Sequence, residues 1–455
     1  MFHPTPALTL RRCSLASRAV LAITTWTIQA AAEDKKPEPP KPPNVIIILA
    51  DDLGYGDLGC FGHPTIATPN LDRMAREGMR LTQFYSAAPV CTPSRAALVT
   101  GRLPVRTGMT SDKRGVLFPD SKGGLQAGEI TIAEALKTKN YATACIGKWH
   151  LGHLPQYLPT RHGFDSYYGI PYSNDMKPAV LLRNERAIED PVDQTTLTDR
   201  YTAEALTFIR QNRKGPFFLY LPHNFPHVPL FASSEFKGKS RRGLYGDVVE
   251  ELDASVGRIL ETLRELKIDD HTFVFFTSDN GPWLVKRGEG GSAGLLREGK
   301  GSTWEGGMRE PAIAWWPGTI PAGRTSAELA SMTDLFATIH KLADIELPPD
   351  VTLDSLDLSG VLTGKSASPR QSMFYYRGTR LMAARMGAWK AHYLTQSGYG
   401  GDAPVPHDPP LLYDLEHDPS EKIDVAKSHP EVIAAMQKLV DEHKATIVPV
   451  PSQLE

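Results

Sequence analysis

The sequence predicts an α/β fold, in which a large, mostly parallel sheet is sandwiched between helices. Residues 45–50 form an unbroken apolar run with no polar alternation, which is typical of a strand buried on both faces of a parallel sheet. Similar runs recur along the chain, at 142–146, 217–221 and 272–277. Helical patterns lie between these runs, at 69–77, 131–139, 201–210 and 247–265. Strands that alternate with helices indicate a sheet covered by helices.

The pattern changes beyond residue 347. Short strand-like runs follow one another there, at 372–377, 381–386, 388–395 and 411–415. This spacing favours an antiparallel sheet, and residues 430–443 are typical of a closing helix. We therefore expect a large domain at 44–347 and a smaller C-terminal subdomain, an antiparallel sheet plus a helix, at 348–455.

The composition is that of an ordinary globular protein. The 455 residues include 50 lysines and arginines against 52 aspartates and glutamates, for a net charge of −2. So small a charge gives no general attraction to nucleic acids or to anionic membranes, which argues against both as partners. The chain has four cysteines, too few for a disulfide framework to be its main source of stability.

The first 32 residues have the pattern of a signal peptide. Arg11 and Arg12 precede a short apolar stretch, and a cleavage site follows Ala32. At about ten residues the stretch is too short to span a membrane as a helix. Residues 33–43 then form a linker rich in proline and lysine, and no asparagine lies in a glycosylation sequon. These features predict a bacterial protein exported by the Sec or the Tat route, to the periplasm or the medium.

Acidic and amide side chains follow two of the predicted strands. Asp51 and Asp52 come directly after the first strand, and Asp279 and Asn280 follow the strand at 272–277. Such residues are common turn formers, but ligands of open α/β sheets also bind at the carboxyl ends of the strands. Three carboxylates packed together need a cation, and all-oxygen ligation suits Ca²⁺ or Mg²⁺ rather than Zn²⁺. The four residues therefore predict a divalent metal site.

A second group of residues surrounds Cys91. Pro93 lies near the start of a short predicted helix and Gly101 at its end, as is typical of these two residue types. Cys91 is then at the N-terminal end of the helix, where an anion is stabilised. The alternative is a buried structural cysteine, which would normally be favoured for a cysteine considered alone.

The segment from Cys91 to Gly101, with its Cys-x-Pro-x-Arg core, resembles the signature of the type I sulfatases. Further blocks resemble this family in the family's order, at 51–59, 68–72, 147–152, 277–281 and 299–307. The resemblance extends from Pro43 to about Asp424. One departure is Asn140, where the family usually has glycine, although asparagine also tolerates left-handed turns.

Two branches of the family share particular segments with this chain. Residues 169–173 resemble arylsulfatase A. Three other segments look more like N-acetylgalactosamine-6-sulfatase, at 152–156, 374–378 and 390–392.

The resemblance implies an alkaline-phosphatase-like fold and the hydrolysis of sulfate esters. In this family the cysteine equivalent to Cys91 is oxidised to Cα-formylglycine, which requires a formylglycine-generating or sulfatase-maturing enzyme as a partner. The implied metal is usually Ca²⁺, held by the four oxygen ligands above, with Mg²⁺ as the alternative. The hydrated aldehyde has two hydroxyls on one carbon, one to attack sulfur and one whose deprotonation releases sulfate.

The resemblance also implies roles for three basic residues near the nucleophile. Arg95, one helical turn beyond Cys91, is expected to orient the hydrate near the metal. Lys148 and His150 point to the same side if their segment is extended, because side chains alternate along a strand. Lys148 then contacts the sulfate and the metal side, and His150 bonds to the hydrate or acts as its general base.

Three further residues complete the predicted site. His227 and Lys300 match the family's remaining contacts to sulfate oxygens, and Ser173 matches a polar contact in arylsulfatase A. A leaving sugar alkoxide needs a proton. His227 or Lys300 can supply it, and His227 is favoured because a histidine titrates near working pH.

The predicted substrate is a sulfated carbohydrate with a terminal 6-sulfated N-acetylgalactosamine or galactose, processed from the chain end, with aryl sulfates as surrogates. Residues that recognise the rest of the substrate are expected in the loops 173–199 and 396–410. An arylsulfatase of small aromatic sulfates is the first alternative. A phosphatase or phosphodiesterase of the alkaline phosphatase superfamily is the second, although it would normally use serine or threonine as nucleophile. A sulfated-glycan-binding protein without catalysis is the third.

Overall fold

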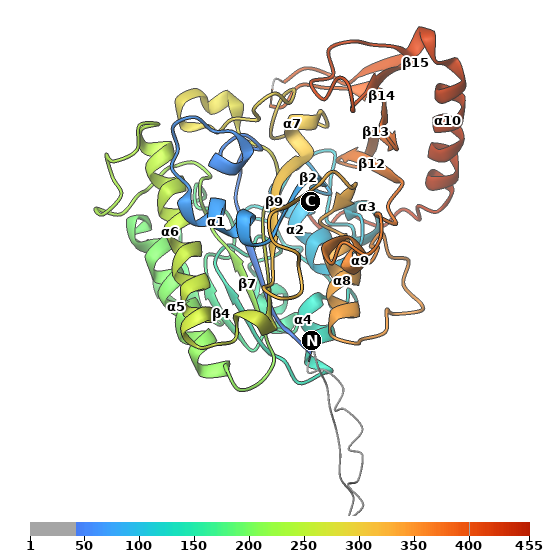
Figure 1. The fold of residues 1–455 in the computed structure, drawn as a ribbon. Helices are drawn as coiled ribbons and strands as arrows, with labels where there is room; N and C mark the ends of the chain where they lie inside the picture. Colours follow the sequence, from blue (N-terminus) through green and yellow to red (C-terminus); the bar gives the residue numbers. More distant parts are fainter. Residues whose placement is uncertain (1–41, 400) are drawn as a thin grey trace, which may run out of the picture. The chain divides into compact units, whose positions relative to one another are not determined.

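Five parallel strands form the centre of the large sheet. A computed structural model describes residues 42–399 and 401–455. In it, neighbouring parallel strands follow one another across the sheet in the order β8 (Thr272–Ser278), β1 (Asn44–Ala50), β7 (Phe217–Pro222), β3 (Ala142–Ile146) and β4 (Ser166–Gly169). The predicted core strands are therefore confirmed, with bounds within one residue. Figure 1 shows helices α5 (Leu197–Asn212) and α6 (Leu244–Glu265) side by side next to this sheet.

Shorter or antiparallel strands extend the sheet on both sides. Beyond β8 lie β9 (Arg309–Trp315), β2 (Met79–Tyr85), β10 (Arg324–Ser326) and β11 (Ala330–Ser331). Beyond β4 lie β5 (Leu181–Arg183) and β6 (Arg186–Glu189). The sequence analysis missed these strands because they are very short or contain charged residues, as β9 does at Arg309 and Glu310.

Helices cover both faces of the sheet, as predicted. Val45, Ile47 and Leu49 of β1 face one core, which is shared with α2 (Cys91–Thr100), α4 (Ile132–Lys137) and α8 (Asp334–Leu342). Ile46 and Ile48 face the other core, which is shared with α1 (Pro69–Glu77), α5 (Leu197–Asn212) and α6 (Leu244–Glu265). Because both faces of β1 are buried, its sequence is a continuous apolar run.

The C-terminal subdomain is an antiparallel sheet with one long helix. Its strands pair in chain order, as β12 (Ser372–Arg377), β13 (Arg380–Met386), β14 (Trp389–Thr395) and β15 (Val405–Asp414). Helix α10 (Pro430–Ala445) packs on this sheet through Met436 and Val440. Strand β15 begins at Val405, before the predicted start at residue 411. The prediction began too late because the first half of this strand contains prolines, which are typical of a loop. Three short helices complete the fold, α3 (Pro104–Thr107), α7 (Glu305–Met308) and α9 (Ser359–Leu362).

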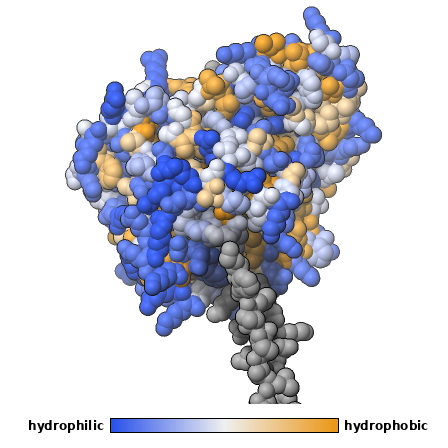
Figure 2. Space-filling view, in the orientation of Figure 1, coloured by the Kyte–Doolittle hydropathy of each residue, from blue (hydrophilic) through white to orange (hydrophobic). Residues whose placement is uncertain are grey.

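The predicted signal peptide and most of the predicted linker lie outside the described residues. Among the residues that the structure describes, no helix is long and apolar enough to cross a membrane. Figure 2 shows hydrophilic side chains over much of one face, with hydrophobic ones scattered between them.

A buried ionic network joins the C-terminal sheet to helix α7. Lys390 Nζ in β14 lies 2.9 Å from Glu305 Oε1 and 3.0 Å from Glu421 Oε1, and all three side chains are fully buried. The backbone amide of Glu305 also donates to Glu421 Oε2. Burial raises the pKa of Glu305, but Lys390 and two arginines outweigh this effect and lower it to about 2. Glu305 therefore stays ionised in its buried position because of the cations beside it, of which Lys390 has the largest effect.

Replacing Lys390 with methionine tests this network. The variant removes the lysine that Glu305 and Glu421 share and leaves them only Arg309 and His392, respectively, as side-chain ion-pair partners. We therefore expect the free energy of unfolding to fall by about 3 kcal/mol, the lower end of the range for a broken buried ion pair. Lys438→Met is the matched control, because the Lys438 side chain is 80% exposed and pairs with Glu442 only at 3.9 Å. It should change stability by less than about 0.5 kcal/mol. Urea unfolding measures both, and equal loss in the two variants would contradict the role of the network.

Candidate active site

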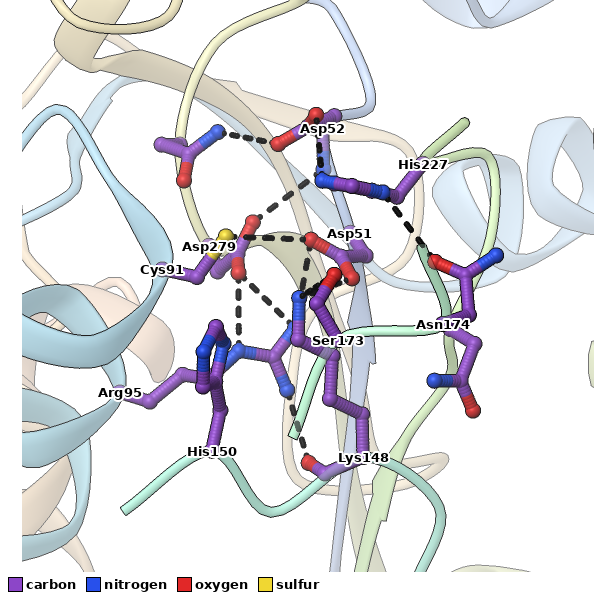
Figure 3. A network of polar contacts seen from close by, with 12 residues as sticks. Asp51, Asp52, Cys91, Arg95, Lys148, His150, Ser173, Asn174, His227 and Asp279 are labelled. Carbon is purple, nitrogen blue, oxygen red and sulfur yellow. Dashed lines mark hydrogen bonds and ion pairs between the residues drawn. The ribbon is translucent and has the colours of Figure 1, made fainter. Parts of the chain in front are cut away.

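The carboxyl ends of the five parallel strands bring the predicted site together. Asp51 and Asp52 follow β1, Asp279 and Asn280 follow β8, and the segments after β3, β4 and β7 supply further side chains. Figure 3 shows most of the group at this edge. The structure gathers here every residue that the sequence predicted for the site: Asp51, Asp52, Cys91, Arg95, Lys148, His150, Ser173, His227, Asp279, Asn280 and Lys300.

Three carboxylates and three cations are buried together. Each carboxylate has a cation of its own, in the pairs Asp51–Lys148 (2.6 Å), Asp52–Lys300 (2.8 Å) and Asp279–Arg95 (2.8 Å). None of these side chains is more than 3% exposed. Their charges therefore interact with little screening by water.

The carboxylates still repel one another. Burial raises the pKa of Asp52 to about 7, with the charges of Asp51 and Asp279 adding to the effect and Lys300 opposing it. Burial and Asp51 also raise the pKa of Asp279. The pKa of Asp51 is lowered, because Lys148 and other cations outweigh burial. A divalent cation among these groups would relieve the repulsion.

Donor atoms of two of the predicted ligands lie close together. Asp51 and Asp52 each have a carboxylate oxygen within 4.8 Å of the other and of donor atoms in Cys91 and His227, a group that could hold a metal ion. Asn280 Nδ2 donates to Asp52 Oδ1 at 2.7 Å, whereas Asn280 Oδ1 is buried without a hydrogen-bond partner among the described residues. An orphaned amide oxygen beside carboxylates is a suitable ligand for Ca²⁺ or Mg²⁺.

Cys91 lies at the N-terminus of α2 and faces charged groups. Its Sγ is 3.5 Å from Asp51 Oδ1 and 3.5 Å from Lys300 Nζ. Burial raises the pKa of the thiol despite the nearby lysines, so the unmodified cysteine is protonated and a poor nucleophile. The helix ends at Gly101, whose φ of +68° suits glycine. The predicted helix is confirmed.

Arg95 forms hydrogen bonds to two other segments of the site, at Asp279 and at Lys148. It lies one turn beyond Cys91 in α2, and its Nε donates to Asp279 Oδ2 at 2.9 Å. Its Nη1 donates to the carbonyl of Lys148, also at 2.9 Å. The fully buried guanidinium thus positions a predicted metal ligand and the segment that follows β3.

The segment from Lys148 to His150 lies beyond the end of strand β3 at Ile146, and His150, with a φ of +60°, is not in an extended conformation. The condition on which the predicted side-chain alternation depended is therefore not met at His150. Lys148 Nζ reaches Asp51 and also lies 3.4 Å from Ser173 Oγ. Both side chains still reach the site.

His150 presents one bare ring nitrogen. Its Nε2 lies 2.9 Å from the carbonyl of Leu117, an acceptor, so this nitrogen carries the proton. Nδ1 is buried and has no hydrogen-bond partner among the described residues. Burial and the charge of Lys148 hold the pKa of His150 well below its usual value, so the ring is neutral and Nδ1 can accept a hydrogen bond.

His227 is held by Asn174, a residue that the sequence analysis did not identify. His227 Nδ1 lies 3.1 Å from Asn174 Oδ1 and 2.5 Å from the carbonyl of Val228. Asn174 cannot exchange its oxygen and nitrogen, because its Nδ2 donates to Gln194 Oε1 and to the carbonyl of Pro229. Asn174 directly follows Ser173, but only the fold shows this contact.

The contacts of His227 fix where its proton lies. Both groups near Nδ1 are acceptors, so Nδ1 carries the proton of the neutral ring. Nε2 then faces Asp52 Oδ2 at 3.7 Å without a proton. Burial and the charge of Lys300 hold the pKa of His227 well below its usual value.

Comparisons with known proteins give the family. The sulfatase family matches residues 43–345, and the C-terminal region of aryl-sulfatases matches residues 368–455. The chain belongs to the sulfatase family. Its relatives include N-acetylgalactosamine-6-sulfatase of Sus scrofa, which is 43% identical over 96% of this chain and 93% of that protein. Arylsulfatase A of Homo sapiens is 44% identical over 88% of this chain and 87% of that protein.

Solved structures share the alkaline-phosphatase-like fold of this sulfatase. The PsFucS1 sulfatase of Pseudoalteromonas sp. has a TM-score of 0.82 and 30% identity, covering 89% of this chain and 90% of that one. A Bacteroides thetaiotaomicron protein described with the metabolism of multiple glycosaminoglycans has a TM-score of 0.80 and 31% identity, covering 89% of this chain and all of that one. A phosphonate monoester hydrolase of Agrobacterium radiobacter, at 19% identity and a TM-score of 0.64, shows the fold alone.

Metal removal tests the site in the sulfatase. A bound cation stabilises the folded state by mass action, and it also relieves the repulsion among the buried carboxylates. Chelation should therefore lower the Tm, and added Ca²⁺ or Mg²⁺ should restore it, as measured by differential scanning fluorimetry. Sodium chloride at matched ionic strength is the control and should not restore the Tm. An unchanged Tm after verified metal removal would count against a cation here.

Proposed function

We propose that this sulfatase releases sulfate from sulfated carbohydrates, with a formylglycine derived from Cys91 as the nucleophile. The observation that carries the proposal is the position of Cys91 Sγ, 3.5 Å from both Asp51 Oδ1 and Lys300 Nζ. A nucleophile derived from Cys91 would then lie between Asp51, a proposed metal ligand, and Lys300, whose ammonium group can bind sulfate. The high pKa of the buried thiol supports the modification, because the unmodified cysteine would react poorly.

Two groups that the chain must acquire complete the proposed machinery. A maturing enzyme would oxidise Cys91, and the formylglycine hydrate would supply a hydroxyl to attack sulfur and a second hydroxyl whose deprotonation expels sulfate. Asp51, Asp52, Asp279 and Asn280 would hold Ca²⁺ or Mg²⁺, which supplies positive charge beside the nucleophile and the sulfate. We also propose export to the periplasm or the medium, on the basis of the predicted signal peptide.

Side chains of the site bind and orient the sulfate and the hydrate. Lys148 and Lys300 provide ammonium groups for charge on the sulfate oxygens, and Ser173 lies beside Lys148 as a further polar contact. His150 has a bare Nδ1, which we propose accepts a hydrogen bond from the hydrate or takes its proton. Arg95 holds Asp279 and the Lys148 segment in position.

The leaving oxygen needs a proton donor, and the contacts favour Lys300 over His227. Neutral His227 has its proton on Nδ1, which faces Asn174 and Val228, so its Nε2 has none to donate. The ammonium group of Lys300 has three protons and lies beside Cys91 Sγ. We therefore reverse the preference drawn from the sequence and assign His227 to sulfate binding.

The proposed substrate carries its sulfate on a terminal sugar. The Cys91 side chain is only 1% exposed, which favours a sulfate that projects from the end of a chain. Relatives of similar identity include both N-acetylgalactosamine-6-sulfatases and arylsulfatase A, but the former match more of this chain. A 6-sulfated N-acetylgalactosamine or galactose is therefore proposed, with aryl sulfates as surrogates. Release of sulfate from defined sulfated sugars by the matured enzyme tests this proposal.

Intact-protein mass spectrometry tests the modification. When the protein is co-produced with a maturing enzyme, its mass should fall by the difference between a thiol and an aldehyde. Cys91→Ala should lose both the mass change and the activity. Cys60→Ala is the control, because Cys60 is only partly buried and lies outside the site, and it should keep both. Normal turnover by Cys91→Ala would refute a nucleophile at this position.

Two lysine variants separate sulfate binding from protonation of the leaving group. Lys148→Ala should lose about 2–4 kcal/mol of transition-state stabilisation on every ester, because it removes one contact to the sulfate oxygens. Lys300→Ala should lose more on a sugar sulfate than on nitrophenyl sulfate, since a nitrophenolate hardly needs a proton. The measurement is kcat/KM on both esters. Equal losses in Lys300→Ala, with an unequal loss in His227→Ala, would make His227 the donor instead.

A further inference from the structure

A cavity of about 370 Å³ lies between the large domain and the C-terminal sheet. Its wall includes Val90 and Gly301, the chain neighbours of Cys91 and Lys300. The amide of Gly301 donates to the carbonyl of Pro89 at 2.8 Å, so the backbone joins these two parts of the wall. The volume is in the range of pockets that take small ligands. The cavity is thus placed to receive the part of a substrate that lies next to its sulfate.

The cavity carries excess positive charge. Arg377, Arg380 and Lys113 line it, together with a single carboxylate, Asp112. Two of these cations already have partners. Arg380 Nε lies 3.6 Å from Asp112 Oδ2, and Lys113 Nζ lies 2.6 Å from Glu455 Oε2.

Arg377 differs from the other two cations. Its Nη1 donates to the carbonyl of Ser397 at 2.8 Å, but in the described part of the chain it forms no ion pair with a carboxylate. Partial burial lowers the pKa of Arg377, and the charge of Asp402 offsets this only in part. The guanidinium remains charged and has further N–H donors to offer a ligand.

We infer that Arg377 binds an anionic group on the sugar next to the sulfated one. The inference rests on the proposed function and specifies its substrate as an acidic sulfated oligosaccharide. A guanidinium matches planar oxyanions with two parallel hydrogen bonds, and a ligand anion would take the place of the carboxylate partner that Arg377 lacks. The anion is the carboxylate of a uronic acid or a second sulfate ester.

Substrate selectivity tests the inference. Three disaccharides share one 6-sulfated sugar, and the neighbouring sugar carries a carboxylate, the corresponding alcohol or a sulfate ester. We expect kcat/KM of the matured wild-type enzyme to be about tenfold to a hundredfold higher for an acidic disaccharide than for the neutral one, as for a hydrogen-bonded charge pair. The better of the two acidic substrates identifies the anion. Arg377→Gln should bring this ratio close to one.

Arg380→Gln is the matched control. Arg380 lies on the same wall but already pairs with Asp112, so its loss should change the ratio by less than about threefold. Arg377→Lys keeps the charge without the planar fork and should retain part of the preference. Raising the salt concentration should also weaken the preference of the wild-type enzyme, a measurement that needs no variant.

The outcomes separate this inference from the proposed function. If the wild-type enzyme desulfates all three disaccharides equally well, or if Arg377→Gln keeps the wild-type ratio, Arg377 has no such role and the proposed function stands. If nitrophenyl sulfate is hydrolysed but no disaccharide releases sulfate, the carbohydrate part of the proposed function fails, and this inference fails with it.

Discussion

Charge balance at the carboxyl edge of the sheet is the constraint on which the rest of the structure depends. Acidic residues directly follow strands β1 and β8, and the surrounding core keeps them from water. Buried charges are costly unless they are paired, and Arg95, Lys148 and Lys300 reach these carboxylates from three other segments. The positions of α2, of the turn after β3 and of the segment before α7 must therefore be compatible with these pairs.

The same constraint links stability to catalysis. Lys148 and Lys300 pair with the buried Asp51 and Asp52. In the proposed function the same carboxylates would hold a divalent cation, and the same ammonium groups would contact sulfate oxygens. Under that proposal the residues that balance the buried charge are also the residues that act on the substrate.

Much of the fold could be predicted because its central strands are buried on both faces. Residues 45–50 and 272–277 have the continuous apolar pattern that is typical of a core strand, and α1 was predicted with its observed bounds. Strands β2 and β9 were missed because they carry polar residues, some of which serve other contacts. Arg309, for example, lies beside Glu305. The turn at His150 was missed because it depends on the path of the chain across the sheet, which local alternation does not encode.

The location of the site was predictable where residue types at the strand ends already suggest chemistry, as Asp51 and Asp279 do. Cys91, at the start of α2, was predicted from the resemblance of its segment to the sulfatase signature. Asn174 is not, because its effect depends on His227, 53 positions away along the chain. The location of the proton on His227 is equally a property of the folded contacts, and it changed the proposed role of that residue. The proposed role of Arg377 depends on its having no carboxylate partner among the described residues, which only the folded structure shows.

The network around Lys390 bears on how this enzyme can be engineered. Glu305 lies five residues beyond Lys300 in the chain, and β14 supplies the cation that Glu305 requires. A chimaera that takes its C-terminal sheet from a relative would therefore receive half of a charge network and disturb the loop that carries Lys300. The useful crossover point is set by this contact surface rather than by the predicted domain boundary at residues 347–348. Recombination that exchanges the 300–308 segment together with β14 and Glu421 would keep both halves matched.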